Sequence, residues 1–319
     1  MQTLTYAAAA ASALGDLMRA DASVVALGED LGRGGIFGQY RGLLDAFGPA
    51  RVIDTPISES TIGGAAVGMA LTGLKPVVEL RVVDFALCAM DEIINQAAKN
   101  RFMFGGQGRV PMVIRMPIGV WSSSAAQHSQ SLEAWFAHVP GLVVACPATP
   151  QDNYSMLQAA VRSGDPVAYF EHKELWGLEG EVDTSAPAEL GRARVARPGR
   201  DVTIVSWSKA VHWSLEAAQA LAAEGIDAEV IDLRTIWPWD RETVLASAER
   251  TGRVLVAHEA VQVAGFGAEI VATLAENSAA RLARVGAPRA PVGYAPVLEA
   301  QVRVTPDRIA AAARRLVRA

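Results

Sequence analysis

A strand, a helix and a second strand follow one another in residues 142–170, which read LVVACPATPQDNYSMLQAAVRSGDPVAYF. The runs Leu142–Cys146 and Val167–Phe170 have the short length of buried strands, whereas Gln151–Arg162 has the length and spacing of a helix. The Gly-Asp-Pro sequence at 164–166 is a helix stop. This order predicts a parallel sheet with helices packed on its faces.

The same alternation continues on both sides of this unit. Further strands are predicted at Val24–Leu27, Pro76–Val82, Val110–Arg115, Val202–Ser206, Ala228–Ile231 and Val254–Ala257. Further helices are predicted at Tyr6–Arg19, Thr61–Leu71, Met90–Arg101, after the strand Val202–Ser206 as far as about Ala223, near Glu242–Glu249, near Ala268–Asn277 and near Pro306–Val317. The pattern dissolves into Glu, Ser, Pro, Gly and Arg from about residue 179 to 200. We therefore predict an α/β protein of two domains, 1–185 and 201–319, each with a mainly parallel sheet flanked by helices and joined by a linker at 186–200.

Composition and charge narrow the class of protein. The chain has 319 residues, 51% of them hydrophobic, and a net charge of -5. Lys and Arg are scattered, which argues against binding to nucleic acid or to an anionic membrane. No run of apolar residues is long enough for a membrane helix, and the N-terminus has no leader pattern, so we expect a cytoplasmic protein. Cys88 and Cys146 are expected to be buried free thiols.

Glu59 stands at the start of a predicted helix, after Asp54-Thr55-Pro56-Ile57-Ser58. Ser58 is a suitable N-cap, and a carboxylate in the first turn suits the helix dipole, so Glu59 is explained without catalysis. The small residues of the segment Gly63–Gly68 allow another helix or chain to come very close. A glutamate pressed against such an interface would lose water and have a raised pKa, as acid–base catalysis requires.

His128 lies in a polar run, Gln127-His128-Ser129-Gln130, that follows Trp121-Ser122-Ser123-Ser124. The simplest interpretation is a surface loop with a hydrogen-bonded imidazole. However, α/β proteins place catalytic groups on loops that follow sheet strands, so His128 is also a candidate catalytic residue.

Several motifs along the chain carry a family resemblance. They are Gly28-Glu29-Asp30, Asp54 to Glu59, Asn95-Gln96-Ala97-Ala98-Lys99, Gln127-His128-Ser129-Gln130, Glu133 to Leu142, Val230-Ile231-Asp232-Leu233-Arg234-Thr235 and His258-Glu259-Ala260 with Gly265 to Ile270. In this order they resemble the beta subunit of the thiamine-diphosphate-dependent component of pyruvate, acetoin and branched-chain 2-oxo acid dehydrogenases. The resemblance runs from about Leu4 to Arg315. It implies a transketolase-like pyrimidine-binding domain followed by a transketolase C-terminal-like domain.

The resemblance also implies roles for three side chains. Glu59 matches the glutamate that hydrogen-bonds N1′ of the cofactor's aminopyrimidine and so favours the tautomer that removes the thiazolium C2 proton. Phe85 matches the aromatic residue that packs on this ring, although it would otherwise be read as an ordinary core residue. His128 matches a histidine at the mouth of the site that donates a proton during acyl transfer to lipoyl sulfur.

Further matches concern acidic residues and a cation. Glu29 and Asp91 match residues along a water-filled path between the two cofactors of the assembly, while a solvated helix carboxylate remains an alternative for Asp91. Residues around Ala160, Val161, Ser163 and Asp165 correspond to a potassium site made mostly of backbone carbonyls.

The chain lacks the Gly-Asp-Gly motif with a downstream Asn that holds magnesium and diphosphate in relatives that work alone. It is therefore expected to supply half a site, with an alpha subunit bringing the other half and the magnesium in an α2β2 heterotetramer. The resemblance also implies a dihydrolipoyl acyltransferase core as partner. A transketolase-like or deoxyxylulose-phosphate-synthase-like enzyme would need both halves in one chain.

The substrate is left partly open by the sequence. Gln127 before His128 and the run Glu171-His172-Lys173 resemble the pyruvate and acetoin branches, whereas the segment Ile118–Ser124 departs from their glycine-rich pattern. We expect an oxidoreductase that acts on a small 2-oxo acid, pyruvate first, or that cleaves acetoin. The alternatives are a branched-chain 2-oxo acid dehydrogenase beta subunit, a non-catalytic assembly subunit and an α/β ligand-binding protein.

Overall fold

The computed structural model describes residues 1–318 and divides the chain into two compact units. The first unit contains residues 1–118 and 135–190. The second contains residues 119–134 and the chain from Gly191 onward. The change at Leu190 falls inside the segment that was predicted as a linker, whereas nothing in the sequence indicated that residues 119–134 would join the second unit.

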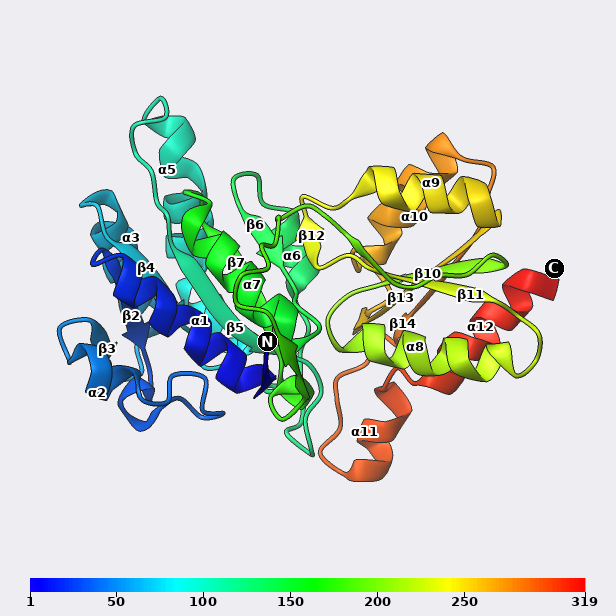
Figure 1. Ribbon diagram of the computed structural model, residues 1–319, viewed down its shortest axis with the longest axis horizontal. Helices are drawn as coiled ribbons and strands as arrows, with labels where there is room; N and C mark the ends of the chain where they lie inside the picture. The colour runs from blue at the N-terminus through cyan, green and yellow to red at the C-terminus, as the bar shows by residue number, and fades with distance from the viewer. Residues whose placement is uncertain (319) are drawn as a thin grey trace. The chain divides into compact units, whose positions relative to one another are not determined.

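The first unit is built on a parallel sheet (Figure 1). Its strands, in spatial order, are β6 (Val143–Ala145), β7 (Val167–His172), β5 (Val113–Ile118), β4 (Lys75–Glu79), β2 (Val24–Gly28) and β3 (Val52–Asp54). A separate antiparallel pair joins β1 (Gln2–Thr5) to β8 (Glu179–Val182). The central strands are buried on both faces, which explains their continuous apolar runs.

Helices cover this sheet and connect its strands. They are α1 (Tyr6–Ala20), α2 (Leu43–Phe47), α3 (Glu59–Leu71), α4 (Val83–Ala86), α5 (Ala98–Met103), α6 (Glu133–Ala137) and α7 (Pro150–Arg162), with short 3-10 turns at Leu31–Arg33, Leu87–Ala89 and Lys173–Leu175. Helices α1 and α7 pack against each other. Their buried faces join the strands in one hydrophobic core that includes Leu14, Met18 and Tyr154.

Local hydrogen bonds fix where the two long helices begin. The Thr5 hydroxyl accepts from the Ala8 N–H at 3.1 Å and caps α1. The Thr149 hydroxyl accepts from the Asp152 N–H at 3.1 Å and caps α7, whose first residue is a proline. Both starts follow the rule that Ser and Thr cap helices and that Pro suits the first position.

Gly28 allows two strands to lie unusually close at their carboxyl ends. Its φ is +154°, and a Cβ atom there would stand 2.4 Å from the Glu79 carbonyl oxygen. Only glycine fits, because any side chain would collide with the backbone of β4. The loop that begins at Glu29 is therefore held directly against the end of β4.

A buried charged network crosses the first unit. Arg115 on β5 donates two hydrogen bonds to the Glu171 carboxylate on β7, at 2.7 and 2.8 Å. Tyr40 donates to Glu79 at 2.9 Å, and the Arg115 guanidinium lies over the Tyr40 ring. Burial, with a smaller effect of nearby Glu171, raises the pKa of Glu79 to about 8 against the opposing effect of Arg115. Glu79 is thus a neutral acid in the folded protein near pH 7.

The second unit contains a five-stranded sheet (Figure 1). Its order is β14 (Arg281–Ala287), β13 (Arg253–Val261), β10 (Val202–Ser206), β11 (Ala228–Asp232) and β9 (Arg194–Arg197), with only β9 antiparallel to its neighbour. The remaining elements are β12 (Thr235–Trp237), α8 (Lys209–Ala222), α9 (Arg241–Thr251), α10 (Gly267–Asn277), α11 (Pro296–Val302) and α12 (Pro306–Arg318). Helices α8 and α12 pack together on one face, while α9 and α10 lie on the other. The prediction of mainly parallel sheets flanked by helices is confirmed.

The structure corrects several local predictions. The predicted helix Met90–Arg101 is a π-helix, η3 (Asp91–Ala97), followed by α5. The strand predicted at Val110–Arg115 begins only at Val113, because Pro111 has no N–H to pair. Cys146 is buried as expected, but the prediction of a buried thiol at Cys88 is wrong, because its side chain lies on the exposed side of the 3-10 turn Leu87–Ala89.

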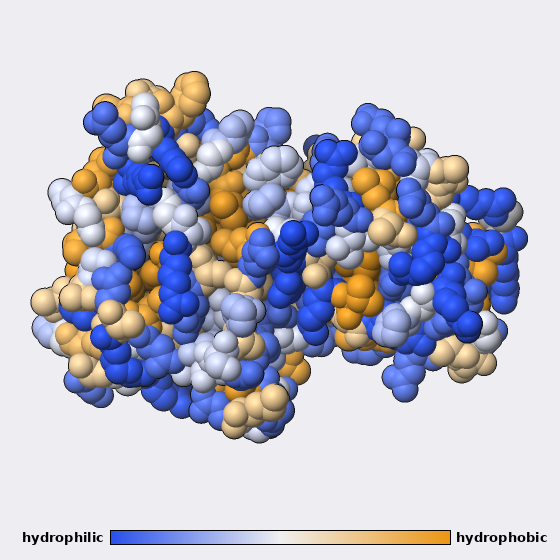
Figure 2. Space-filling view, turned by 45° about the horizontal axis from the view of Figure 1, so that its top comes forward, coloured by the Kyte–Doolittle hydropathy of each residue, from blue (hydrophilic) through white to orange (hydrophobic). Residues whose placement is uncertain are grey.

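Large hydrophobic side chains are exposed at the C-terminal end of α5. Phe102 and Met103 are 89% and 70% exposed, and Phe104 follows them. Figure 2 shows hydrophobic residues gathered on this projecting part of the first unit. No helix within residues 1–318 is long and apolar enough to cross a membrane. The cytoplasmic location stays a prediction.

Candidate active site

The carboxyl ends of β2, β3 and β4 bring together the loops that carry the predicted acidic residues. After β3, the Asp54 carboxylate accepts hydrogen bonds from the Leu31 N–H at 3.0 Å and the Gly32 N–H at 3.1 Å. Asp30 adopts a left-handed backbone at φ 57° and pairs with Arg81, which follows β4, at 3.2 Å. This edge is where open parallel sheets bind ligands.

Glu29 and Glu59 are two predicted site residues that interact electrostatically, since the Glu59 carboxylate acts on the pKa of Glu29. Glu29 directly follows β2 and is 6% exposed, and its Oε1 has no hydrogen-bond partner within the described chain. Burial raises the pKa of Glu29, and the Glu59 carboxylate raises it further, while Arg81 lowers it. The site therefore holds a poorly solvated carboxyl group whose proton is retained to a higher pH than that of an ordinary glutamate.

Glu59 is the first residue of α3, and Ser58 precedes it as N-cap residue. The Ser58 hydroxyl donates to the Thr61 hydroxyl at 2.8 Å, and no side-chain cap bond to the helix backbone forms. The predicted position of Glu59 at a helix start is thus confirmed, but the expected capping by Ser58 is wrong. Glu59 is half-buried within its own unit.

Phe85 and Asp91 lie on the segment that packs beside α3. Phe85 is half-buried in α4, and Asp91 is exposed at the start of η3. The Asp91 carboxylate accepts from Asn95 at 2.7 Å and lies 3.4 Å from the Gln96 amide. Single π-helical segments inside longer helices often occur at functional sites.

Small residues set the separation between α3 and η3. A Cβ on Gly63 would lie 3.1 Å from the Glu92 Cβ, so glycine permits the close contact. On the outer side of α3, Gly64, Ala65 and Gly68 are exposed. The small-residue helix behind Glu59 thus has one buried face and one exposed face.

The predicted potassium residues gather at the end of α7. The Ser163 hydroxyl donates to the Ala160 carbonyl at 2.8 Å and lies 3.2 Å from the Asp165 carbonyl. The Asp165 carboxylate pairs with Arg101, which leaves carbonyl and hydroxyl oxygens as ligands for a cation. Val161 is buried. Residues 1–318 contain no cluster of three His, Cys, Asp or Glu side chains that could hold a metal, and a carbonyl site is of another kind. The potassium site stays a prediction.

His128 belongs to the second unit, on an exposed position of the segment 119–134. The segment is held by two glutamates, Glu259 at the end of β13 and Glu299 on α11. Sequence reasoning missed both glutamates, because they lie more than a hundred residues from the segment that they bind. The motif His258-Glu259-Ala260 indicates the family but not the contact that Glu259 makes with this segment.

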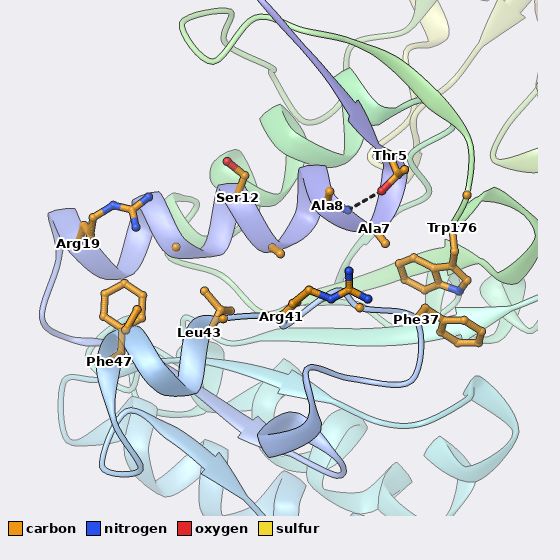
Figure 3. A pocket seen from close by; sticks show the side chains of 16 residues that line it. Thr5, Ala7, Ala8, Ser12, Arg19, Phe37, Arg41, Leu43, Phe47 and Trp176 are labelled. Atoms are coloured by element: carbon orange, nitrogen blue, oxygen red, sulfur yellow. Dashed lines mark hydrogen bonds between the residues drawn. The ribbon is translucent and has the colours of Figure 1, made fainter.

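The first unit also has a groove of about 640 Å³ along α1 (Figure 3). Its floor is the small-residue face of α1, and Arg41, Leu43 and Phe47 face this helix from the opposite side. The stacked rings of Phe37 and Trp176, with centroids 5.0 Å apart, close one end. None of the predicted site residues lines this groove, so its size does not make it the active site.

Comparisons with known proteins identify both units. Residues 2–177 match the transketolase pyrimidine-binding domain and residues 191–309 match the transketolase C-terminal domain. A solved split-gene transketolase, described as an inactive beta4 tetramer, resembles the chain with a TM-score of 0.84 and 25% identity, over 99% of this chain and 98% of that one. The chain is therefore a two-domain protein of the transketolase type.

Curated relatives define the family more narrowly. The acetoin:2,6-dichlorophenolindophenol oxidoreductase subunit beta of Cupriavidus necator is 44% identical over 94% of both chains. The 2-oxoisovalerate dehydrogenase subunit beta of Bacillus subtilis is 40% identical over 99% of both. The mitochondrial pyruvate dehydrogenase E1 component subunit beta-2 of Oryza sativa subsp. japonica is 43% identical over 98% of this chain and 86% of the relative. The chain belongs to the family of E1 beta subunits of pyruvate, acetoin and branched-chain 2-oxo acid dehydrogenases, as the resemblance predicted.

Proposed function

We propose that this chain is the beta subunit of a thiamine-diphosphate-dependent enzyme that decarboxylates a small 2-oxo acid or cleaves acetoin and passes the acyl group to a lipoyl group. One observation supports this proposal most directly. Glu29 lies at the carboxyl edge of the sheet in the domain of the pyrimidine-binding type, 6% exposed and with an Oε1 that has no hydrogen-bond partner within the described chain. The Glu59 carboxylate raises the pKa of this buried group, in addition to the effect of burial.

The side chains present fit the pyrimidine half of the cofactor. Glu59 would hydrogen-bond the ring nitrogen N1′ and exchange a proton with it, and Phe85 would pack on the ring. The unpartnered oxygen of Glu29 leaves a buried acceptor for water or a polar ligand atom. When bound, thiamine diphosphate supplies the carbon that adds to the keto group and the ring that accepts the electrons released with carbon dioxide. His128 would donate a proton during transfer to lipoyl sulfur.

The remaining parts of the site would come from a partner. The names of the relatives contain the words "subunit beta", which supports an alpha subunit for this chain as well. We propose that this subunit brings the magnesium and binds the diphosphate, in an α2β2 heterotetramer. Asp91 and Glu29 would line the path between two cofactors, and an acyltransferase core would receive the acyl group.

The experiment uses the chain assembled with its alpha subunit. Carbon dioxide release would be measured with pyruvate and with branched 2-oxo acids, and acetoin cleavage would be measured in parallel. Pyruvate or acetoin is expected to give the highest kcat/KM, whereas a preference for branched 2-oxo acids would assign the chain to the other branch. An assembled complex that is inactive on every compound would overturn the proposed function and favour a non-catalytic assembly subunit.

A further inference from the structure

His128 is carried by a loop of unusual backbone shape, Gly119–Ser131, called here the His128 loop. The Gly119 N–H donates to the Gln130 carbonyl at 3.0 Å and closes the base of the loop. Ser122, Ser123 and Ala125 have φ values of 34°, 58° and 59°, a left-handed conformation that side chains adopt only at a cost. Such a backbone persists only when other contacts hold it in place.

Packing holds only part of the loop, since Val120 and Ser129 are buried but the residues between them are half-buried or exposed. A cavity of about 480 Å³ lies within the second unit, between the His128 loop and the body of the unit. Val120 and Ser129 line it from the loop, and Val261, Ala287 and Pro291 line it from the opposite side. Hydrogen bonds therefore contribute to holding the less buried part of the loop in this conformation.

Glu259 supplies two of these hydrogen bonds and joins both ends of the loop. Its Oε1 accepts from the Val120 N–H at 3.3 Å, and its Oε2 accepts from the Ser131 hydroxyl at 3.1 Å. Glu259 is 8% exposed and belongs to β13, a strand with neighbours on both sides. One carboxylate on a central strand therefore forms hydrogen bonds with both ends of the His128 loop.

Glu299 supplies a third hydrogen bond, near the tip. Its Oε2 accepts from the Ser123 N–H at 2.6 Å, while its Oε1 pairs with Arg303 at 2.7 Å. This bond reaches one of the left-handed residues. Arg303 fixes the carboxylate from the other side, so that Glu299 presents a single oxygen to the loop.

We propose that Glu259, assisted by Glu299, is a positioning residue that holds His128 for proton donation in acyl transfer. This inference rests on the proposed function, because it assigns a task to His128. The positioning role of Glu259 requires hydrogen-bonding geometry rather than negative charge. A glutamine at 259 keeps an oxygen for the Val120 N–H and offers an amide donor to the Ser131 hydroxyl, whereas a leucine loses both bonds.

The test compares Glu259→Gln and Glu259→Leu in the assembled complex, with Glu276→Gln as a matched control on an exposed part of α10. Carbon dioxide release with an artificial dye as acceptor and acyl transfer to a lipoyl domain would be measured on each. We expect Glu259→Leu to lower acyl transfer about tenfold or more and to leave dye-coupled decarboxylation within about threefold. Glu259→Gln and Glu276→Gln should stay within about threefold in both assays. His128→Ala, like Glu259→Leu, should lower acyl transfer more than dye-coupled decarboxylation.

Amide hydrogen exchange of the segment 119–131 provides a second measurement that needs no activity. Exchange should accelerate in Glu259→Leu and not in Glu259→Gln or Glu276→Gln. Unchanged exchange in Glu259→Leu would overturn the proposal, as would an equal loss of both activities or a glutamine variant as impaired as the leucine variant. If the unmodified complex were inactive on every substrate, the proposed function would fail, while the exchange measurement would still decide whether Glu259 holds the loop.

Discussion

Glu29 presents a buried carboxyl group whose Oε1 has no hydrogen-bond partner within the described chain. Leaving such a group unsatisfied costs about 1–3 kcal/mol. Burial and the Glu59 carboxylate both raise the pKa of Glu29, because each disfavours its charged form. A cost of this size at the carboxyl edge of a parallel sheet is what a binding site prepared for a ligand would show.

Glu59→Gln tests the catalytic role of this pair. The amide keeps the size and can still form a hydrogen bond, but it cannot hold and release a proton at pH 7. We expect the variant to assemble with the alpha subunit and to lose about 100-fold or more in carbon dioxide release. Glu276→Gln, which removes the same charge from α10, should keep full activity. Activity of Glu59→Gln within a few-fold of the unmodified complex would contradict the role.

Glu79 provides a stability prediction. The folded chain holds the Glu79 proton up to a pKa of about 8, whereas an unfolded glutamate releases it near 4.5. Between these values the unfolded state binds fewer protons, so this group's stabilising contribution is complete below pH 4.5 and is lost as pH rises through 8. The midpoint temperature of thermal unfolding should therefore fall as pH rises through this window. The accompanying loss in the free energy of unfolding should be a few kcal/mol at most.

Glu79→Gln is the matched variant for this effect. The amide resembles the neutral acid and still accepts from Tyr40, so folding should survive. The decline of the unfolding midpoint between pH 5 and 8 should become shallower than in the unmodified chain. An identical decline in both chains would show that Glu79 does not hold its proton.

Site features that depend on neighbouring residues in the sequence could be predicted, whereas contacts between distant residues could not. Glu59 at a helix start could be predicted, because a serine followed by a carboxylate in the first turn is typical of the beginning of a helix. The coupling of Glu29 to Glu59 could not be predicted from spacing, since it depends on β2 and β3 lying side by side. The same limit hid Glu259 and Glu299, whose partners in the His128 loop are distant along the chain.

At the scale of elements, strands with continuous apolar runs were predicted well and edge elements were missed. β7 and β10 are buried and rich in Val, Ile and aromatic residues, and the sequence predicted both. β8 and β9 lie in the segment predicted to lack regular structure, because each has only four residues and neither is a continuous apolar run. The π-helix η3 was read as α-helical, since two turns of apolar spacing do not separate the two helical periods.

Thr149→Ala tests the capping of α7. The substitution removes the acceptor for the Asp152 N–H and the hydroxyl that donates to the Asp152 carboxylate at 2.6 Å. We expect a loss of about 1 kcal/mol in the free energy of unfolding, measured with urea. Thr184→Ala removes an exposed hydroxyl from the same unit and should change stability by less than about 0.5 kcal/mol. Equal effects of the two substitutions would show that the cap contributes nothing specific.

At the scale of the whole molecule, the chain combines two domains of transketolase type with an open small-residue face on α3. The predicted pyrimidine-side residues Glu29, Glu59, Phe85 and Asp91 all belong to the first unit, and His128 belongs to the second. The chain lacks the Gly-Asp-Gly motif for diphosphate.

Cofactor binding by the purified chain tests this division directly. If this chain contacts only the aminopyrimidine, then the cofactor bound to the chain alone lacks the charged interactions that its diphosphate makes with magnesium in the alpha subunit. We therefore expect thiamine diphosphate to bind the chain alone at least about 100-fold more weakly than the complex with the alpha subunit, about 2.8 kcal/mol, in calorimetric titrations with magnesium present. Glu59→Gln should weaken binding to the complex without changing the oligomeric state, which separates loss of the cofactor contact from loss of assembly. Binding to the isolated chain within a few-fold of the complex would mean that this chain contains a complete site, and the shared-site proposal would then be wrong.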